Sequence, residues 1–145
     1  MKYKPRFYLG GKYEERGEIK KIALELVKLG CEWTCDWTKH TGTSLSKYAE
    51  EDINGVLDAD FVIIKKDKVQ YYKGTWVEIG AALANSMPVY VVGVAEPDEI
   101  FLYHPLVRKF ETFRELFNFI RVYWLGENIY IRTRKPAPFD FEVVK

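Results

Sequence analysis

The sequence contains little of what marks a secreted, metal-rich or membrane-spanning protein. Its 145 residues include only two cysteines, Cys31 and Cys35, and two histidines. A C-x3-C pair without further cysteines or a histidine cluster predicts neither a zinc site nor a disulfide framework, so we expect reduced packing residues and no metal. No apolar run approaches the ~20 residues that span a bilayer, and no signal-peptide core follows the basic N-terminus. We therefore expect a cytoplasmic protein without membrane contact.

An excess of charge of one sign is also missing. The chain has 22 Lys and Arg against 21 Asp and Glu, a net charge of +1, and its basic residues are spread along the sequence. Such a balance creates no field that attracts a nucleic-acid polymer, which we therefore exclude as a partner. A hydrophobic fraction of 48% and an aromatic fraction of 16% predict one ordered domain with a real core.

Predicted strands and helices alternate along the first 125 residues. Apolar runs, and one stretch in which Cys and Trp alternate with polar residues, predict strands at 6–9, 31–37, 61–64 and 88–93. Apolar residues at helical spacing predict amphipathic helices at 14–29, 45–56, 75–86 and 112–124. Gly30 supplies a stop for the first helix. This order predicts the α/β class, as a single-domain, doubly wound (flavodoxin- or Rossmann-like) parallel sheet flanked by helices.

Residues 126–145 differ from the rest and predict a C-terminal extension. Residues 130–132 could add an edge strand, and the Pro-Ala-Pro segment at 136–138 reads as a spacer that could reach a neighbouring subunit. We therefore divide the chain into an α/β domain, 1–125, and an extension, 126–145.

Glu78 is a candidate for chemistry because of its position after a predicted strand. Ligands of open α/β sheets bind beyond the carboxyl ends of the strands, so loops and first helical turns are the places to search. With Thr75 as N-cap, Glu78 has the spacing of a capping box. The same position would also keep a catalytic carboxylate ionised at the positive end of a helix. Both interpretations remain open at this point.

Asp52 is a second candidate because it falls within or at the edge of an apolar helical stripe. Tyr48, Ala49 and Val56 lie three or four residues from it. A buried carboxylate costs several kcal/mol unless it is paired or used, so Asp52 either caps a loop, pairs with a lysine or serves a site. Two carboxylates in different environments are the groups that cleave glycosidic bonds, and double displacement needs them about 5 Å apart.

Three segments resemble the nucleoside 2-deoxyribosyltransferase family over about the first 120 residues. They are Tyr-Leu-Gly-Gly at 8–11, Asp-Ile-Asn-Gly-Val-Leu-Asp-Ala-Asp at 52–60, and the segment at 74–92 that begins Gly-Thr-Trp-Val-Glu. His-Pro-Leu-Val at 104–107, followed by Phe110, is similar to a small phage and microbial branch of that family. The family is related to the 2′-deoxynucleoside 5′-phosphate N-hydrolases.

The resemblance implies a function and a role for individual residues. Glu78 matches the nucleophile that forms a covalent deoxyribosyl intermediate, Asp52 matches the residue that orients the substrate or protonates the base, and Tyr8 matches a tyrosine that holds the nucleophile. The resemblance therefore implies an enzyme that cleaves or exchanges the N-glycosidic bond of a nucleoside or nucleotide. Because carboxylates suffice for this reaction, we expect no metal or organic cofactor. We also expect the protein to form at least a dimer. The substrate-binding residues that we expect are Gly10, Gly11, Trp37, Tyr72, Lys73 and Gly74.

One departure from the family leaves the substrate open. Many members have Asp or Ser six residues before the nucleophile, where this chain has Tyr72. An Asp there helps to read the base, and a Ser helps to hold a 5′-phosphate. Lys73 could meet a phosphate or be a solvated loop residue. The alternative function is therefore a nucleotide-binding or sensing module without turnover, and a purely structural subunit is a third reading. His40 and His104 read as lone loop histidines.

Overall fold

A computed structural model of the chain describes residues 3–67 and 73–127, with Lys73 described by its backbone alone. Five parallel strands form one sheet in the order β2-β1-β3-β4-β5. The strands are β1 (Arg6–Gly10), β2 (Glu32–Trp33), β3 (Phe61–Lys66), β4 (Val89–Gly93) and β5 (Val107–Phe110). The α-helices are α1 (Arg16–Leu29), α2 (Leu45–Leu57), α3 (Lys73–Ala84) and α4 (Phe113–Tyr123). Short 3-10 helices are η1 (Tyr13–Glu15), η2 (Trp37–Lys39) and η3 (Ile100–Tyr103). The predicted fold class is confirmed.

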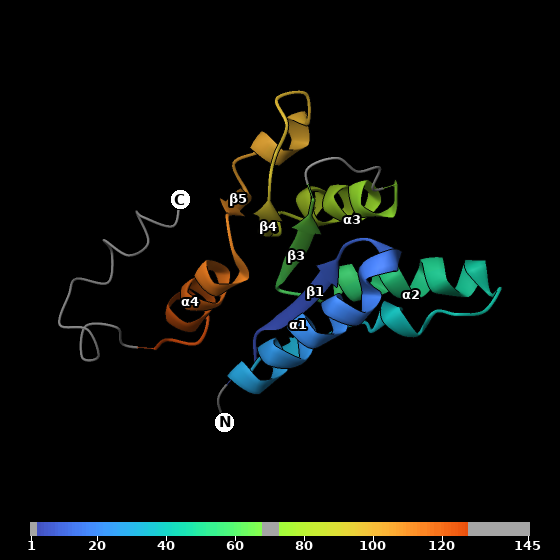
Figure 1. Cartoon of the computed structure of the whole chain (residues 1–145), viewed down its shortest axis with the longest axis horizontal. Coiled ribbons are helices and arrows are strands. Elements are labelled where there is room, and N and C mark those ends of the chain that lie inside the picture. The colour runs from blue at the N-terminus through green and yellow to red at the C-terminus, as the bar shows by residue number, and fades with distance from the viewer. Residues whose placement is uncertain (1–2, 68–72, 128–145) are drawn as a thin grey trace.

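Helices cover both faces of the sheet, α1 and α4 on one side and α2 and α3 on the other (Figure 1). The alternation of side chains along the strands explains the division. Phe61 stands on the first face and its ring meets Trp124 just after α4, at 4.7 Å between centroids. Tyr8, on the opposite face of β1, contacts Glu78 of α3 instead. The strands β1, β3 and β4 are buried on both faces, as continuous apolar runs predict.

The second predicted strand is much shorter than expected. The alternation at 31–37 predicted one strand, but β2 ends at Trp33. The strand does not continue to residue 37, because the Asp36 carboxylate accepts a hydrogen bond from the backbone N–H of Thr38 at 3.1 Å and the chain turns into η2. Trp37 therefore lies in a 3-10 helix rather than at a strand end, and its indole Nε1 donates to the carbonyl of Leu9 at 2.6 Å.

The fifth strand was missed from the sequence. In β5, Arg108 and Lys109 interrupt the apolar pattern, as is common at the edge of a sheet. The segment before it is anchored by the buried Lys66, whose Nζ donates to the carbonyl of Val94 at 2.8 Å and pairs with Glu99 at 2.9 Å. An Lys–Glu pair thus ties the end of β3 to the segment that leads from β4 to β5.

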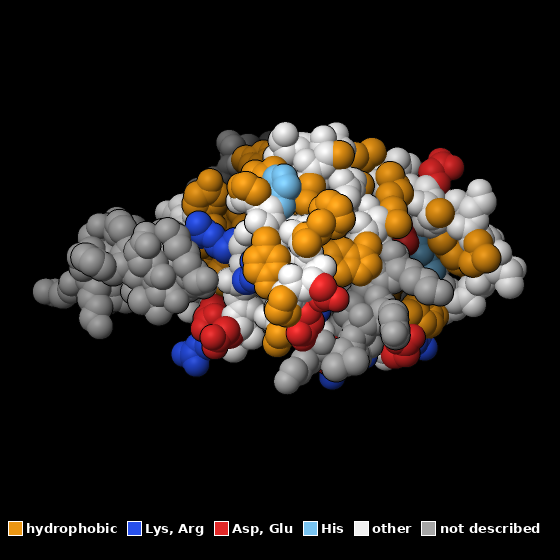
Figure 2. Space-filling view, turned by 90° about the horizontal axis from the view of Figure 1, so that it is seen from above, with side chains coloured by type: hydrophobic (Ala, Val, Ile, Leu, Met, Phe, Trp, Pro, Cys, Tyr) orange, Lys and Arg blue, Asp and Glu red, His pale blue; other side chains and the backbone are white. Residues whose placement is uncertain are grey.

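The surface above the carboxyl ends of the strands carries exposed apolar side chains. Hydrophobic side chains gather in the middle of the face seen from above (Figure 2). Large exposed ones in the segment between β4 and β5 are Val94, Ile100, Phe101 and Tyr103. Within the described residues, none of the helices combines the length and the apolar character that crossing a bilayer requires. The predicted strand at 130–132 and the spacer at 136–138 lie outside the described residues.

Candidate active site

The site lies where the strand order changes direction, between β1 and β3. In a 2-1-3-4-5 sheet, the helices that follow β1 and β3 lie on opposite faces, which leaves a crevice beyond the ends of these two strands. The loop after β1 and the helix that follows β3 both border it. Gly11 from the first and Glu78 from the second line one pocket there.

A hydrogen bond joins the two elements at the crevice. The Tyr8 hydroxyl on β1 donates to Oε2 of Glu78 on α3 at 2.6 Å. Gly10 makes room for this arrangement, because a Cβ at its position would lie 2.6 Å from Glu78 Oε1. The carboxylate is thus held from one side by a buried tyrosine and packs against a backbone that carries no side chain. Both of these contacts to the Glu78 carboxylate come from β1, the strand that lies beside its helix.

Glu78 and Asp52 line the same pocket of about 320 Å³. Asp52 comes from α2, the helix that packs against α3 on this face of the sheet. The convergence that the sequence predicted is therefore present in the described residues. The full lining is Gly11, Lys12, Tyr13, Glu14, Trp37, His40, Asp52, Gly74, Thr75 and Glu78.

Burial is the largest cause of a raised pKa in both carboxyl groups. It raises the pKa of Glu78 to about 7; the hydrogen bond from Tyr8 opposes this rise, and the charge of Asp52 adds to it. Burial also raises the pKa of Asp52, against the lowering effects of His40 and of a hydrogen bond from Cys35. Each carboxyl can therefore change its protonation state nearer to neutral pH than an exposed one would.

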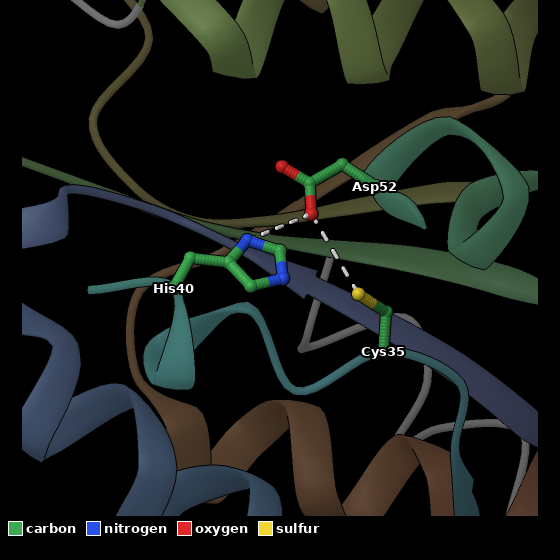
Figure 3. Close-up of side chains that lie close together, drawn as sticks. All are labelled: Cys35, His40 and Asp52. Atoms are coloured by element: carbon green, nitrogen blue, oxygen red, sulfur yellow. Dashed lines mark hydrogen bonds and ion pairs between the residues drawn. The ribbon is translucent and has the colours of Figure 1, made fainter. Parts of the chain in front are cut away.

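Asp52 is held by two side chains from the segment between β2 and α2. Its Oδ1 accepts a hydrogen bond from the Cys35 thiol at 3.6 Å, and His40 Nδ1 lies 3.6 Å from the same oxygen. The three side chains point toward one another in Figure 3. The other nitrogen of His40, Nε2, lies 3.3 Å from Glu51, and its ring stacks on Tyr48 with centroids 4.1 Å apart.

This cluster does not have the arrangement of a cysteine nucleophile. An activated thiol needs a base that takes its proton, usually a histidine within hydrogen-bond reach. Here the thiol of Cys35 donates to Asp52 instead, and burial raises the pKa of Cys35 to about 12. The thiol is therefore neutral near pH 7. Both cysteines are free thiols, as predicted, although Cys35 does more than fill space.

The pocket brings together most of the predicted site residues. Gly11, Trp37 and Gly74 line it beside the two carboxylates. Tyr8 donates a hydrogen bond to Glu78, and Gly10 leaves room for the Glu78 carboxylate. A Cβ on Gly74 would meet no atom of the described residues within 4 Å, so they leave a ligand open space there. Tyr72 and the side chain of Lys73 lie outside the described residues.

Three interpretations from the sequence are wrong. The capping box fails because α3 begins at Lys73, so Thr75 is the third helical residue and Glu78 lies in the second turn, bonded to Tyr8. The expectation that the helix end keeps Glu78 ionised also fails, because burial raises its pKa to about 7. His40 is not an isolated loop residue, since it lines the pocket and contacts Asp52. Its contacts arise from folding and leave no signal in the spacing along the chain.

Pocket residues that the sequence reading missed are Lys12, Tyr13, Glu14, His40 and Thr75. Three of these follow directly after the Gly-Gly pair that ends β1. Their proximity to that pair was a usable signal, because the loop after β1 borders the crevice in this class of fold.

No protein-family model and no curated protein matches this sequence. Solved structures match over most of the chain. One, from a study of a 2-deoxyribosyltransferase of Bacillus psychrosaccharolyticus, is 18% identical with a TM-score of 0.65, over 78% of this chain and 90% of the other. This chain has the 2-deoxyribosyltransferase fold. The CMP N-glycosidase of Clostridium botulinum is 19% identical with a TM-score of 0.58, over 81% of this chain and 99% of the other. The resemblance drawn from the motifs is thus confirmed for the fold.

Proposed function

We propose that the protein cleaves or exchanges the N-glycosidic bond of a deoxynucleoside or nucleotide, with Glu78 as the nucleophile. The observation that carries the proposal is a partly buried carboxylate, held by Tyr8, that lines the same pocket as a second carboxylate. Solved structures with this fold include a 2-deoxyribosyltransferase and a CMP N-glycosidase, which favours this reaction class. Both carboxylates act through their own oxygens, so the reaction uses no metal or organic cofactor.

The reaction is a double displacement at the anomeric carbon. An oxygen of ionised Glu78 bonds to C1′ while the C1′–N bond breaks and its electron pair leaves with the base. Asp52, if protonated, delivers a proton to the departing base, and if ionised it orients the sugar by accepting a hydroxyl proton in a hydrogen bond. Water or a second base then attacks C1′ and gives up a proton to Asp52 or to solvent, while the bond from C1′ to Glu78 breaks and releases the carboxylate. Hydrolysis and transfer differ only in which of these two arrives.

The remaining predicted residues take supporting roles in the same proposal. Tyr8 keeps Glu78 aimed at the pocket, Gly11 and Gly74 let the substrate approach the backbone, and Trp37 borders the base. Tyr72 and Lys73 are proposed to adjoin the base or a 5′-phosphate. Self-association into at least a dimer belongs to the proposal too. The exposed Ile100 and Phe101 are candidates for buried positions in such an assembly, which light scattering on the purified chain would measure.

Base release from defined substrates tests the proposal. The protein is incubated with deoxyinosine plus free adenine, and separately with deoxynucleoside monophosphates, and free and exchanged bases are separated by chromatography. We expect turnover in at least one mixture and a loss of at least about 1,000-fold in Glu78→Ala. Glu50→Gln, a change on the same helix as Asp52 but outside the pocket, is the matched control. Equal base release by the parent protein and Glu78→Ala would end the enzyme proposal.

A nucleotide-binding or sensing module without turnover is the second candidate. One oxygen of Asp52 is already occupied by Cys35 and His40, which favours a carboxylate that holds a ligand rather than one that delivers a proton. Calorimetry separates the two functions. A sensing module binds a nucleotide with unchanged affinity in Glu78→Gln and releases no base.

A further inference from the structure

We propose that Cys35, His40 and Asp52 form a binding site for a Zn²⁺ ion. The three side chains offer one sulfur, one nitrogen and one oxygen ligand, and these atoms all lie within 4.8 Å of one another. Among the described residues, no other group of three such side chains comes together in this way. A mixed set of thiolate, imidazole and carboxylate is typical of zinc sites and poor for Mg²⁺ or Ca²⁺, which prefer oxygen.

The distances match the spacing of ligands around zinc. Tetrahedral zinc with its usual bond lengths keeps sulfur, nitrogen and oxygen ligands about 3.3–3.6 Å apart. Cys35 Sγ and His40 Nδ1 each lie 3.6 Å from Asp52 Oδ1. Only the separation between Cys35 and His40 has room to be larger, within the limit of 4.8 Å. Small side-chain rotations would therefore complete three corners of a tetrahedron, while the fourth stays open for water.

The surroundings of His40 are those of a zinc ligand. A histidine that binds metal through one nitrogen almost always donates its other N–H to a carboxylate or carbonyl, which fixes the ring. His40 faces the cluster with Nδ1 and has Glu51 Oε2 3.3 Å from Nε2. The Tyr48 ring stacks on the imidazole at 4.1 Å. His40 and Asp52 also line the pocket, which gives an ion access from solvent.

Zinc binding has a defined chemical consequence. The Cys35 thiol loses its proton to solvent as the sulfur bonds to the metal, and its hydrogen bond to Asp52 is replaced by two metal–ligand bonds. The positive charge of the ion makes the Asp52 carboxylate a weaker hydrogen-bond acceptor and keeps it from carrying a proton, so it serves a substrate less well. The inhibitory part of this inference rests on the proposed function, and predicts that Zn²⁺ inhibits turnover and that a chelator restores it. Binding itself is independent of any activity.

Cobalt substitution tests the site directly. The metal-free full chain is titrated with Co²⁺ alone, and absorption is recorded for a thiolate-to-cobalt charge-transfer band. We expect about one Co²⁺ per chain and displacement of the band by Zn²⁺. Cys35→Ser should abolish the band, whereas Cys31→Ser, which removes the other thiol outside the cluster, should retain it. No band in the parent chain, or one that survives Cys35→Ser, overturns the proposal.

Calorimetry with Zn²⁺ supplies a second measurement whose signal does not come from a thiolate absorption band. Glu51→Gln should weaken binding about tenfold or more, because it removes the carboxylate that orients His40. The adjacent Glu50→Gln is the control and should bind as the parent does, and circular dichroism checks that each variant is folded. Equal affinity in Glu51→Gln and the parent contradicts the assigned geometry. If the chain binds zinc but releases no base even after its metal has been removed, this site stands and the enzyme function falls. If the metal-free chain releases base but binds no zinc, the reverse holds.

Discussion

The hydrogen bond between Tyr8 and Glu78 joins residues 70 positions apart and holds one carboxylate at the pocket. Burial raises the pKa of Glu78 to about 7, while the Tyr8 hydroxyl lowers it by stabilising the charged form. A nucleophilic carboxylate acts only when ionised, so kcat/KM for base release should rise with pH through about 7. This rising limb of the profile reports the ionisation of Glu78 in the free protein.

Tyr8→Phe should move that rising limb to higher pH. The substitution keeps the buried ring and removes only the hydroxyl that lowers the pKa of Glu78. The measurement is kcat/KM from pH 5 to 9. Tyr90→Phe is the control, since Tyr90 is also a buried tyrosine, but its hydroxyl accepts from Trp124 at 2.8 Å, outside the pocket. A limb that stays in place or moves to lower pH in Tyr8→Phe contradicts the role assigned to the hydroxyl.

At the scale of elements, α2 approaches β1 closely through Gly55. A Cβ at that position would lie 2.5 Å from Cys35 Cβ and 3.4 Å from the Tyr8 ring. The carbonyl of Gly55 also accepts the Thr34 hydroxyl at 2.6 Å. Since α2 carries Asp52, the same contact sets how far that carboxylate stands from the sheet. The helix position and the pocket are therefore coupled.

Gly55→Ala should destabilise the protein by about 1–3 kcal/mol, because the added methyl group overpacks this contact. Thermal melting at fixed pH measures the effect. Gly80→Ala on α3 is the matched control. Its added Cβ meets no atom within 4 Å in the part of the chain that the structure describes, so it should stabilise by up to about 1 kcal/mol through better helix propensity. Gly55→Ala should also reduce base release by displacing Asp52. Equal melting temperatures for the two variants would contradict the close approach.

For the molecule as a whole, the pocket lowers stability at the pH where it would work. The pKa of Glu78 rises from 4.5 in the unfolded chain to about 7 in the folded one, so the folded state binds this proton more tightly. Stability from this group is therefore fully present below about pH 4.5 and is lost as the pH rises to about 7. The loss above pH 7 is at most about 3 kcal/mol.

Glu78→Gln should remove this pH dependence. The amide carbonyl can still accept the Tyr8 hydroxyl, and it has no charge to bury. We expect the variant to melt several degrees above the parent at pH 8 and close to it at pH 5, as measured by calorimetry across this range. Glu25→Gln, on an exposed position of α1, should show a far smaller change with pH. A gain in Glu78→Gln that is the same at both pH values would contradict the assigned cause.

The sequence alone determined the class of fold and the place of the catalytic candidates along the chain. Apolar runs such as 61–64 and the stop at Gly30 are local patterns, which physical rules translate directly into strands and helix ends. It also pointed to Glu78 and Asp52, because one follows a buried strand and the other breaks an apolar stripe. Short strands were not predicted correctly from the sequence. The second strand is shorter than predicted because Asp36 turns the chain, and β5 was not predicted because Arg108 and Lys109 interrupt its apolar pattern.

Tertiary structure alone decided how these residues meet. The bond from Tyr8 to Glu78, the space left by Gly10, and the cluster of Cys35, His40 and Asp52 all join residues from different elements. Their spacing along the chain carries no trace of this, since β1 and β3 become neighbours only when the sheet forms. The raised pKa of each carboxyl is likewise a property of the fold, because burial is the largest cause of the rise.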